Sequence, residues 1–92
     1  MKFLISVILC SLPLITIAEI TREFNGIEYY LVHDLNTADG ECFLRGHEKA
    51  REYLSVSTKL KNVIALTSNG NDYIKLPVSK GPYSLIDYLV CE

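Results

Sequence analysis

The first 18 residues set the strongest limit on what this 92-residue chain can fold into. A short positive start precedes residues 3–18, which form a mainly apolar run without acidic residues, and Thr16 and Ala18 place small residues at both subsites of a cleavage site. This pattern is typical of a secretory signal peptide. The run is shorter than the roughly 20 residues that a spanning helix needs, and Pro13 would interrupt such a helix. We therefore predict cleavage after Ala18, secretion, and no stable membrane anchor.

Cleavage would leave one small domain, residues 19–92. The chain has 11 Asp plus Glu against 9 Lys plus Arg, and loss of Lys2 makes the domain more acidic. The cationic residues between Glu41 and Lys61 alternate with acidic ones instead of forming a cluster. Because a phosphate backbone attracts proteins through clustered Lys and Arg, strong nucleic-acid binding is not expected.

Cysteine use agrees with export. The chain has three cysteines, and Cys10 would leave with the leader, so Cys42 and Cys91 remain. An even pair in a small exported domain predicts a disulfide. Closing a loop of about 50 residues would contribute at most roughly 4 kcal/mol, comparable to the whole stability of a small domain. The alternative is a reactive thiol, but the acidic neighbours Glu41 and Glu92 disfavour a thiolate.

The first half of the domain gives mixed signals. Residues 19–25 are polar enough to be a loose arm that docks by one or two side chains. Residues 27–35 predict a strand with alternating faces, and turn-forming residues at 34–40 predict a bend. Apolar residues at helical spacing predict a helix over roughly residues 46–58, although residues 53–58 also alternate as a strand would.

The second half is clearer. Two apolar runs, residues 62–67 and 72–78, flank Asn69-Gly70, which is a strong hairpin signal. A turn at Gly81-Pro82 leads to a final strand over residues 83–91, with a short helix from Ser84 as the alternative. The sequence therefore predicts an α+β fold, with one short helix packed on a small antiparallel sheet and stapled by one disulfide.

Few residues suit catalysis. His33, or His47 with a nearby glutamate and Arg45, could be imagined in a set for phosphodiester cleavage, but no motif brings these groups together. The sequence has no spacing typical of a metal site, no glycine-rich phosphate loop and no nucleophile elbow. We therefore expect no catalytic residues, no metal and no cofactor.

Tyrosine is the most informative residue type, with six in the chain. Tyr29 and Tyr30 are adjacent on the predicted strand, so at least one should reach the surface. Tyrosine is favoured at binding surfaces because it buries a large area at low entropy cost, whereas the alternative is that the rings fill and cover a small core. The candidate binding residues are Tyr29, Tyr30, Tyr73 and the nearby Lys75.

Two families are similar to parts of this chain. The leader resembles those of powdery-mildew candidate effectors, and residues 63–76 resemble the C-terminal hairpin of RNase-like (RALPH) effectors, in which a cysteine near the C-terminus bridges to one just before the helix. This resemblance implies a helix on an antiparallel sheet without the ribonuclease catalytic set. The family's Tyr-x-Cys motif is absent here, since Gly40 stands in the tyrosine position. Residues 53–69 resemble two strands of MAX effectors, which implies a two-sheet β-sandwich.

We therefore expect a secreted, effector-like virulence protein that binds a host macromolecule, with an immune-related protein as the first expectation, without catalysis. Transfer into host cells stays open. One alternative is a secreted ribonuclease-like enzyme or cytotoxin that uses His33 or His47 with Arg45. The other is an enzyme inhibitor whose loop at residues 34–41 or turn at 69–71 enters a cleft. Helix or strand at residues 46–58 distinguishes the two resemblances.

Overall fold

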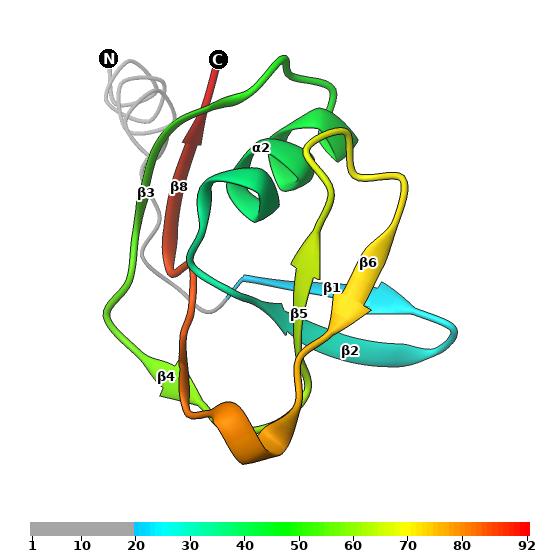
Figure 1. Cartoon of the computed structure of the whole chain (residues 1–92). Coiled ribbons are helices and arrows are strands. Elements are labelled where there is room, and N and C mark those ends of the chain that lie inside the picture. Colours follow the sequence, from blue (N-terminus) through cyan, green and yellow to red (C-terminus); the bar gives the residue numbers. More distant parts are fainter. Residues whose placement is uncertain (1–19) are drawn as a thin grey trace, which may run out of the picture.

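The computed structural model describes residues 20–92, so the predicted signal peptide and its cleavage after Ala18 lie outside the described residues. These residues form an α+β fold, which confirms the predicted class (Figure 1). The elements are β1 (Thr21–Phe24), β2 (Ile27–Leu31), α2 (Leu35–Leu44), β3 (Ala50–Leu54), β4 (Thr58–Lys59), β5 (Val63–Leu66), β6 (Tyr73–Lys75), the 3-10 helix η1 (Val78–Lys80), β7 (Tyr83–Ser84) and β8 (Tyr88–Cys91).

The larger sheet has four strands in the order β1-β2-β5-β6. β1 and β2 are antiparallel and joined by Asn25-Gly26, whose φ angles of 54° and 79° suit the two-residue turns of hairpins. The predicted loose arm is therefore wrong, because residues 21–24 form strand β1. β2 and β5 are parallel, while β5 and β6 form the antiparallel hairpin predicted around Asn69-Gly70. The sheet is thus mixed, with one parallel pair.

Two further strand pairs complete the fold. β3 pairs with β8 and β4 pairs with β7, both antiparallel. A bridge between Val32 and Leu85 joins the C-terminal segment to the end of β2. Asp87 is 2% exposed and accepts hydrogen bonds from the Val56 and Ser57 amides at 2.9 and 2.8 Å. This carboxylate fixes the turn between β3 and β4.

The helix lies earlier in the chain than predicted. The predicted helix over residues 46–58 is wrong, because residues 50–54 form β3, and the predicted bend at 34–40 is also wrong, because α2 begins there. Asp34 caps α2 by accepting a hydrogen bond from the Thr37 amide at 2.8 Å. Gly46, with a φ of 91°, ends the helix one residue after its C-cap.

Helix α2 packs across β5 and beside the β3–β8 pair (Figure 1). Its residues Thr37 and Ala38 are fully buried, and the Thr37 hydroxyl oxygen accepts a hydrogen bond from the Leu66 amide at 3.0 Å. Buried apolar side chains from three elements and one connecting segment meet between the helix and the sheet: Tyr29, Leu31, Ala38, Ile64, Leu66 and Ile86.

The disulfide joins Cys42 in α2 to Cys91 in β8, which confirms the predicted bridge. Cys42 lies within the helix and not before it, so the order of elements expected from the RALPH resemblance does not hold. The strand over residues 50–54 is the outcome linked to the MAX resemblance, yet α2 is foreign to a β-sandwich. The structure therefore does not decide between the two resemblances.

Candidate binding surfaces

An aromatic cluster lies on one face of the larger sheet. The register of β1, β2 and β6 places Phe24, Tyr29 and Tyr73 on this face. The Phe24 and Tyr73 rings stack with centroids 4.2 Å apart, and the Tyr29 centroid is 5.9 Å from that of Tyr73. Since β1 and β6 are the two edges of the sheet, the rings hold its edges together.

Lys75 extends from β6 over this cluster. Its Nζ lies 5.6 Å from the centroid of the Tyr29 ring. The interaction with the Tyr29 hydroxyl raises the pKa of Lys75, so the amine is charged at neutral pH. Tyr29 is only 4% exposed. It therefore positions Lys75, while Lys75 itself is available to a partner.

A concave surface of about 400 Å³ opens beside Lys75. Ile27 and Val78 contribute apolar side chains that are 46% and 50% exposed, and Lys61 and Lys75 contribute the charged groups. None of the lining residues is acidic. We name this concavity the Lys75 surface. We include Tyr73 in it, because the Tyr73 ring contacts the Tyr29 ring that lines the concavity.

Tyr30 lies on the opposite face of the sheet from Tyr29. The Nζ of Lys59 on β4 stands 5.0 Å from the Tyr30 ring centroid, within the range of a cation–π contact. The fold thus brings Tyr29, Tyr73 and Lys75 together and separates them from Tyr30.

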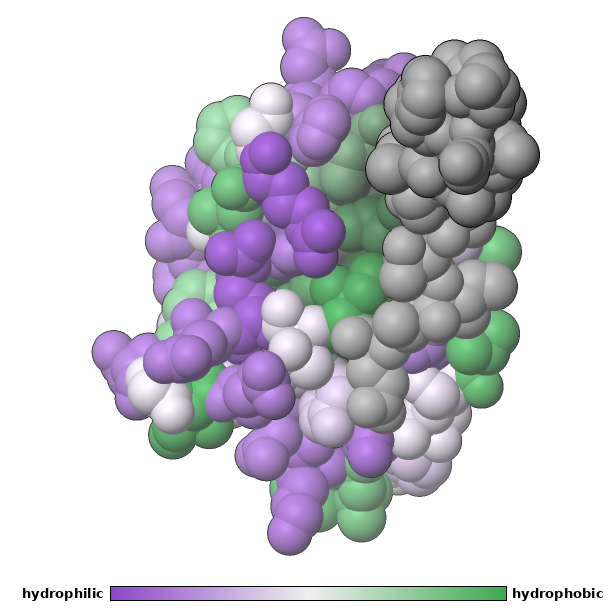
Figure 2. Space-filling model, turned by 180° about the vertical axis from the view of Figure 1, so that it is seen from behind, coloured by the Kyte–Doolittle hydropathy of each residue, from purple (hydrophilic) through white to green (hydrophobic). Residues whose placement is uncertain are grey.

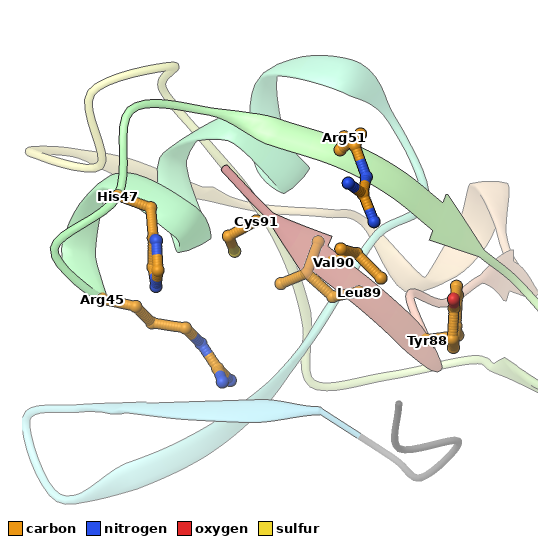
Figure 3. Close-up of a pocket in the computed structure, with 7 residues that line it drawn as sticks. All are labelled: Arg45, His47, Arg51, Tyr88, Leu89, Val90 and Cys91. Carbon is orange, nitrogen blue, oxygen red and sulfur yellow. The ribbon is translucent and has the colours of Figure 1, made fainter. Parts of the chain in front are cut away.

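A second concavity, of about 470 Å³, runs along β8 (Figure 3). All four residues of this strand line it, together with Arg45, His47 and Arg51 from the chain between α2 and β3 and from β3 itself. Arg45 is also bonded to Glu41. We name this concavity the β8 groove. Sequence reasoning noted Arg45 and His47 but missed Arg51 and Tyr88, because only the β3–β8 pairing brings these two together.

Tyr88 closes one end of the β8 groove (Figure 3). Burial raises the pKa of its hydroxyl above the ordinary 10.0, and a hydrogen bond donated to Glu52 at 3.1 Å acts in the same direction. The nearby Arg51 opposes this shift. Tyr88 is therefore a neutral hydrogen-bonding group at physiological pH.

The described residues do not assemble the imagined phosphodiesterase set. His33 shares a hydrogen bond of 3.0 Å with the Tyr53 carbonyl and does not line the β8 groove that His47 lines. Glu41 is 1% exposed, and its two oxygens are taken by Arg22 and Arg45. The available carboxylates near His47 are thus engaged in holding the fold or lie outside the groove lining.

Within residues 20–92, no group of histidine, cysteine and acidic side chains could hold a metal ion. The same part of the chain contains no helix long and apolar enough to cross a membrane. Helix α2 occupies most of residues 34–41, which the inhibitor hypothesis treats as a loop, while the turn at 69–71 lies between β5 and β6.

Hydrophobic side chains reach the molecular surface in several places between hydrophilic ones (Figure 2). The largest exposed fractions belong to Val56 at 73% and Ile74 at 65%. Ile74 lies on the edge strand β6 next to Lys75, so apolar side chains continue beyond the concavity along this edge. No family model, curated protein or solved structure matches this chain.

Proposed function

We propose that this protein is a secreted, effector-like binding protein that recognises a host protein through the Lys75 surface and carries out no catalysis. The proposal extends to an immune-related partner, as the effector resemblance implies. It rests on the arrangement of the residues and on the predicted signal peptide.

One observation supports the proposal above the others. Lys75 and Lys61 line a concavity together with exposed apolar side chains. Lys75 also contacts the Tyr29 ring, which belongs to the aromatic cluster. Protein interfaces typically have an apolar, aromatic-rich centre and a polar rim. A rigid support lowers the entropy cost of ordering such a surface on binding.

The charge of the surface indicates the type of partner. The chain is acidic overall, with a formal net charge of −2, yet the lining of the Lys75 surface contains lysines and no acidic residue. The positive Lys75 surface attracts an acidic region of a partner. The negative charge of the rest of the molecule repels acidic molecules that approach in other orientations. Two lysines are too few to track a nucleic-acid backbone strongly, so a protein is the favoured partner.

Affinity capture from plant extract tests the proposal. The immobilised protein should retain one or more specific proteins, and Lys75→Glu should abolish that retention, because it reverses the charge at the centre of the surface. Tyr73→Ala should also weaken retention by removing the ring that stacks on Phe24. Lys49→Glu makes the same charge change at an exposed lysine outside the surface and should retain the same proteins.

The proposal fails if wild-type protein retains nothing specific, or if Lys75→Glu and Lys49→Glu behave alike. Circular dichroism of each variant should match the wild type, which separates loss of a contact from loss of folding.

A ribonuclease-like activity is the second candidate, because the β8 groove places His47 beside Arg45 and Arg51. A histidine with two cationic neighbours could handle a proton at a phosphodiester. Incubation of the purified protein with RNA tests this directly. Cleavage that His47→Ala abolishes and His33→Ala leaves intact would favour this candidate, whereas an inert protein would exclude it.

A further inference from the structure

We propose that the β8 groove binds an extended acidic segment of another protein by adding it as a strand to the free edge of β8. This goes beyond the function proposed above, because it assigns a second surface on a different sheet and commits to a different mode of recognition.

One edge of β8 is free for pairing in the described part of the chain. Among residues 20–92, β8 pairs only with β3, so one of its edges has no strand partner. The reciprocal hydrogen bonds between Lys49 and Glu92, at 2.9 and 3.4 Å, form a hydrogen-bonded pair next to Cys91. In an antiparallel ladder the neighbouring residue then directs its N–H and C=O away from the partner strand. Cys91 therefore presents backbone groups at the free edge.

The β8 groove runs along this edge. Successive side chains of a strand point to opposite faces, so a concavity on one face touches alternate residues. The β8 groove is lined by four consecutive residues, Tyr88–Cys91 (Figure 3). Such a lining places the backbone itself at the groove wall. Four residues of strand extend about 13 Å at 3.3 Å per residue, enough for four or five residues of an added strand.

The charges at the groove rim favour an acidic segment. Arg45, His47 and Arg51 rim the groove, and none of the residues that line it is acidic. Arg45 spends its Nε on Glu41, but its side chain is 47% exposed. Arginine binds carboxylates through its planar fork of N–H donors. An incoming strand with acidic side chains at alternate positions would place them all on one face, where the two arginines can reach them.

The apolar part of the lining fits the same occupant. Leu89 and Val90 are partly buried and stand between the cationic residues and Tyr88. Leu89 and Val90 point to opposite faces of the strand, so an extended segment that alternates acidic and β-branched residues would contact the arginines on one face and one of these apolar side chains on the other. Strand addition takes its affinity from backbone hydrogen bonds and its specificity from such alternate side chains.

The test uses protein purified after expression of the complete chain and a fluorescein-labelled peptide, Val-Glu-Val-Glu-Val-Glu-Val. Fluorescence anisotropy should show saturable binding that weakens as salt rises, because the charges at the groove rim are partly exposed. A peptide with lysine in place of each glutamate should not bind. A peptide that keeps the glutamates but has proline at alternate valines should bind at least about ten-fold more weakly, since proline has no backbone donor.

Variants of the protein give matched controls. Arg51→Glu should weaken binding of the acidic peptide by about ten-fold or more. Lys80→Glu makes the same charge change at an exposed residue of η1 outside the groove and should stay within about two-fold of the wild type. Lys75→Glu should also bind the peptide normally, so failure of the Lys75 surface and failure of the groove are distinguishable.

Amide hydrogen exchange supplies a readout specific to strand addition. The bound peptide should slow exchange of the Cys91 amide. The proposal is overturned if the peptide does not bind, if the proline peptide binds equally well, or if exchange at Cys91 is unchanged in the complex.

Discussion

At the scale of single residues, one buried carboxylate connects three parts of the fold. Glu41 in α2 accepts two hydrogen bonds from Arg22 of β1, at 2.6 and 3.0 Å, and one from Arg45 at 2.7 Å. Its pairing with Arg22 raises the pKa of that arginine. Glu41 thus links the helix to the edge of the sheet and holds Arg45 at the rim of the β8 groove.

Replacement of Glu41 should therefore be costly. Glu41→Gln keeps the shape but leaves two arginines without their counter-charge, and we expect a loss of about 2–3 kcal/mol in the free energy of unfolding, at the low end for buried pairs because both arginines are partly exposed. Urea denaturation measures this. The control Glu23→Gln changes an exposed glutamate on β1 and should cost less than about 0.5 kcal/mol. Equal effects of the two variants would contradict the role of Glu41.

Tyr88 gives a prediction about alkaline stability. Its pKa is raised above 10.0 in the folded protein, mainly by burial. Above that value the unfolded chain loses the proton first, so the stability from neutral Tyr88 is complete below pH 10 and is lost as the pH rises through the folded pKa. Tyr88→Phe should therefore show a smaller fall in stability between about pH 9 and about pH 11, measured by urea denaturation.

Two other ionisable residues, Glu52 and Lys75, affect the result of that experiment. Glu52→Gln should give an intermediate slope, because it removes the hydrogen-bonded carboxylate but not the burial of Tyr88. Lys75, whose pKa is also raised, loses its contribution in the same direction as the pH rises, so part of the fall should remain in Tyr88→Phe. A slope equal to that of the wild type in Tyr88→Phe would contradict the burial argument.

At the scale of elements, the placement of α2 depends on small residues. A Cβ built on Gly40 would overlap the Thr67 carbonyl oxygen and come within 3.1 Å of the Leu66 side chain. The helix can approach β5 this closely only because position 40 has no side chain. Backbone space, more than a stripe of large apolar residues, therefore determines how the helix packs.

Gly40→Ala should consequently reverse the usual effect of this substitution. In an exposed helix interior, alanine is better than glycine by about 1 kcal/mol. In α2 the added methyl group would force the helix away from β5, and we expect a loss of about 2 kcal/mol. Thermal denaturation followed by circular dichroism would detect it. Asn36→Ala, at an exposed position of the same helix, should be neutral or slightly stabilising, and a gain in Gly40→Ala would refute the close packing.

The turns could be predicted from the sequence, whereas the packing of α2 could not. The hairpin around Asn69-Gly70 was predictable because turn-forming residues separate two apolar runs, and Asn25-Gly26 carried a similar signal before β2, where polar neighbours obscured it. Helix α2 was not predictable from periodicity, since small and turn-forming residues occupy its buried face. Its end signals, Asp34 and Gly46, were present, but they enclose a segment that resembles a loop.

The wrongly predicted helix and the unpredicted part of the site share one cause. Residues 46–58 have apolar residues at helical spacing, but β3 forms within them because it pairs with β8, about 38 residues later in the chain. No local pattern encodes that pairing. In the same way, Tyr29, Tyr73 and Lys75 could each be selected as amphipathic or charged residues. Only the β2–β5–β6 arrangement shows that they converge and that Tyr30 does not.

At the scale of the whole molecule, the disulfide joins the helix to the C-terminal strand. It ties α2 to the last strand across 49 residues of sequence and so holds the β3–β8 pair against the helix. The chain-entropy argument gives a contribution of roughly 4 kcal/mol for a loop of this length. The β8 groove depends on this connection, since Cys91 belongs to its lining.

Removal of the bridge should therefore destabilise the entire domain. The double variant Cys42→Ala, Cys91→Ala should lose about 3–4 kcal/mol and unfold at a markedly lower temperature, and reduction of the wild type should give the same result. Differential scanning calorimetry with and without reductant makes the comparison. An unchanged unfolding temperature would mean that the packing around α2 holds the fold without the bridge.

We propose above all that this protein holds a partner protein at the Lys75 surface. Hydrogen–deuterium exchange of the protein alone and with the protein that it retains from host extract tests this most directly. We predict slower exchange in residues 61–63 and 73–78 of the complex, with Lys75→Glu showing no change under the same conditions. Protection confined to other parts of the chain, with residues 73–78 unaffected, would contradict the account.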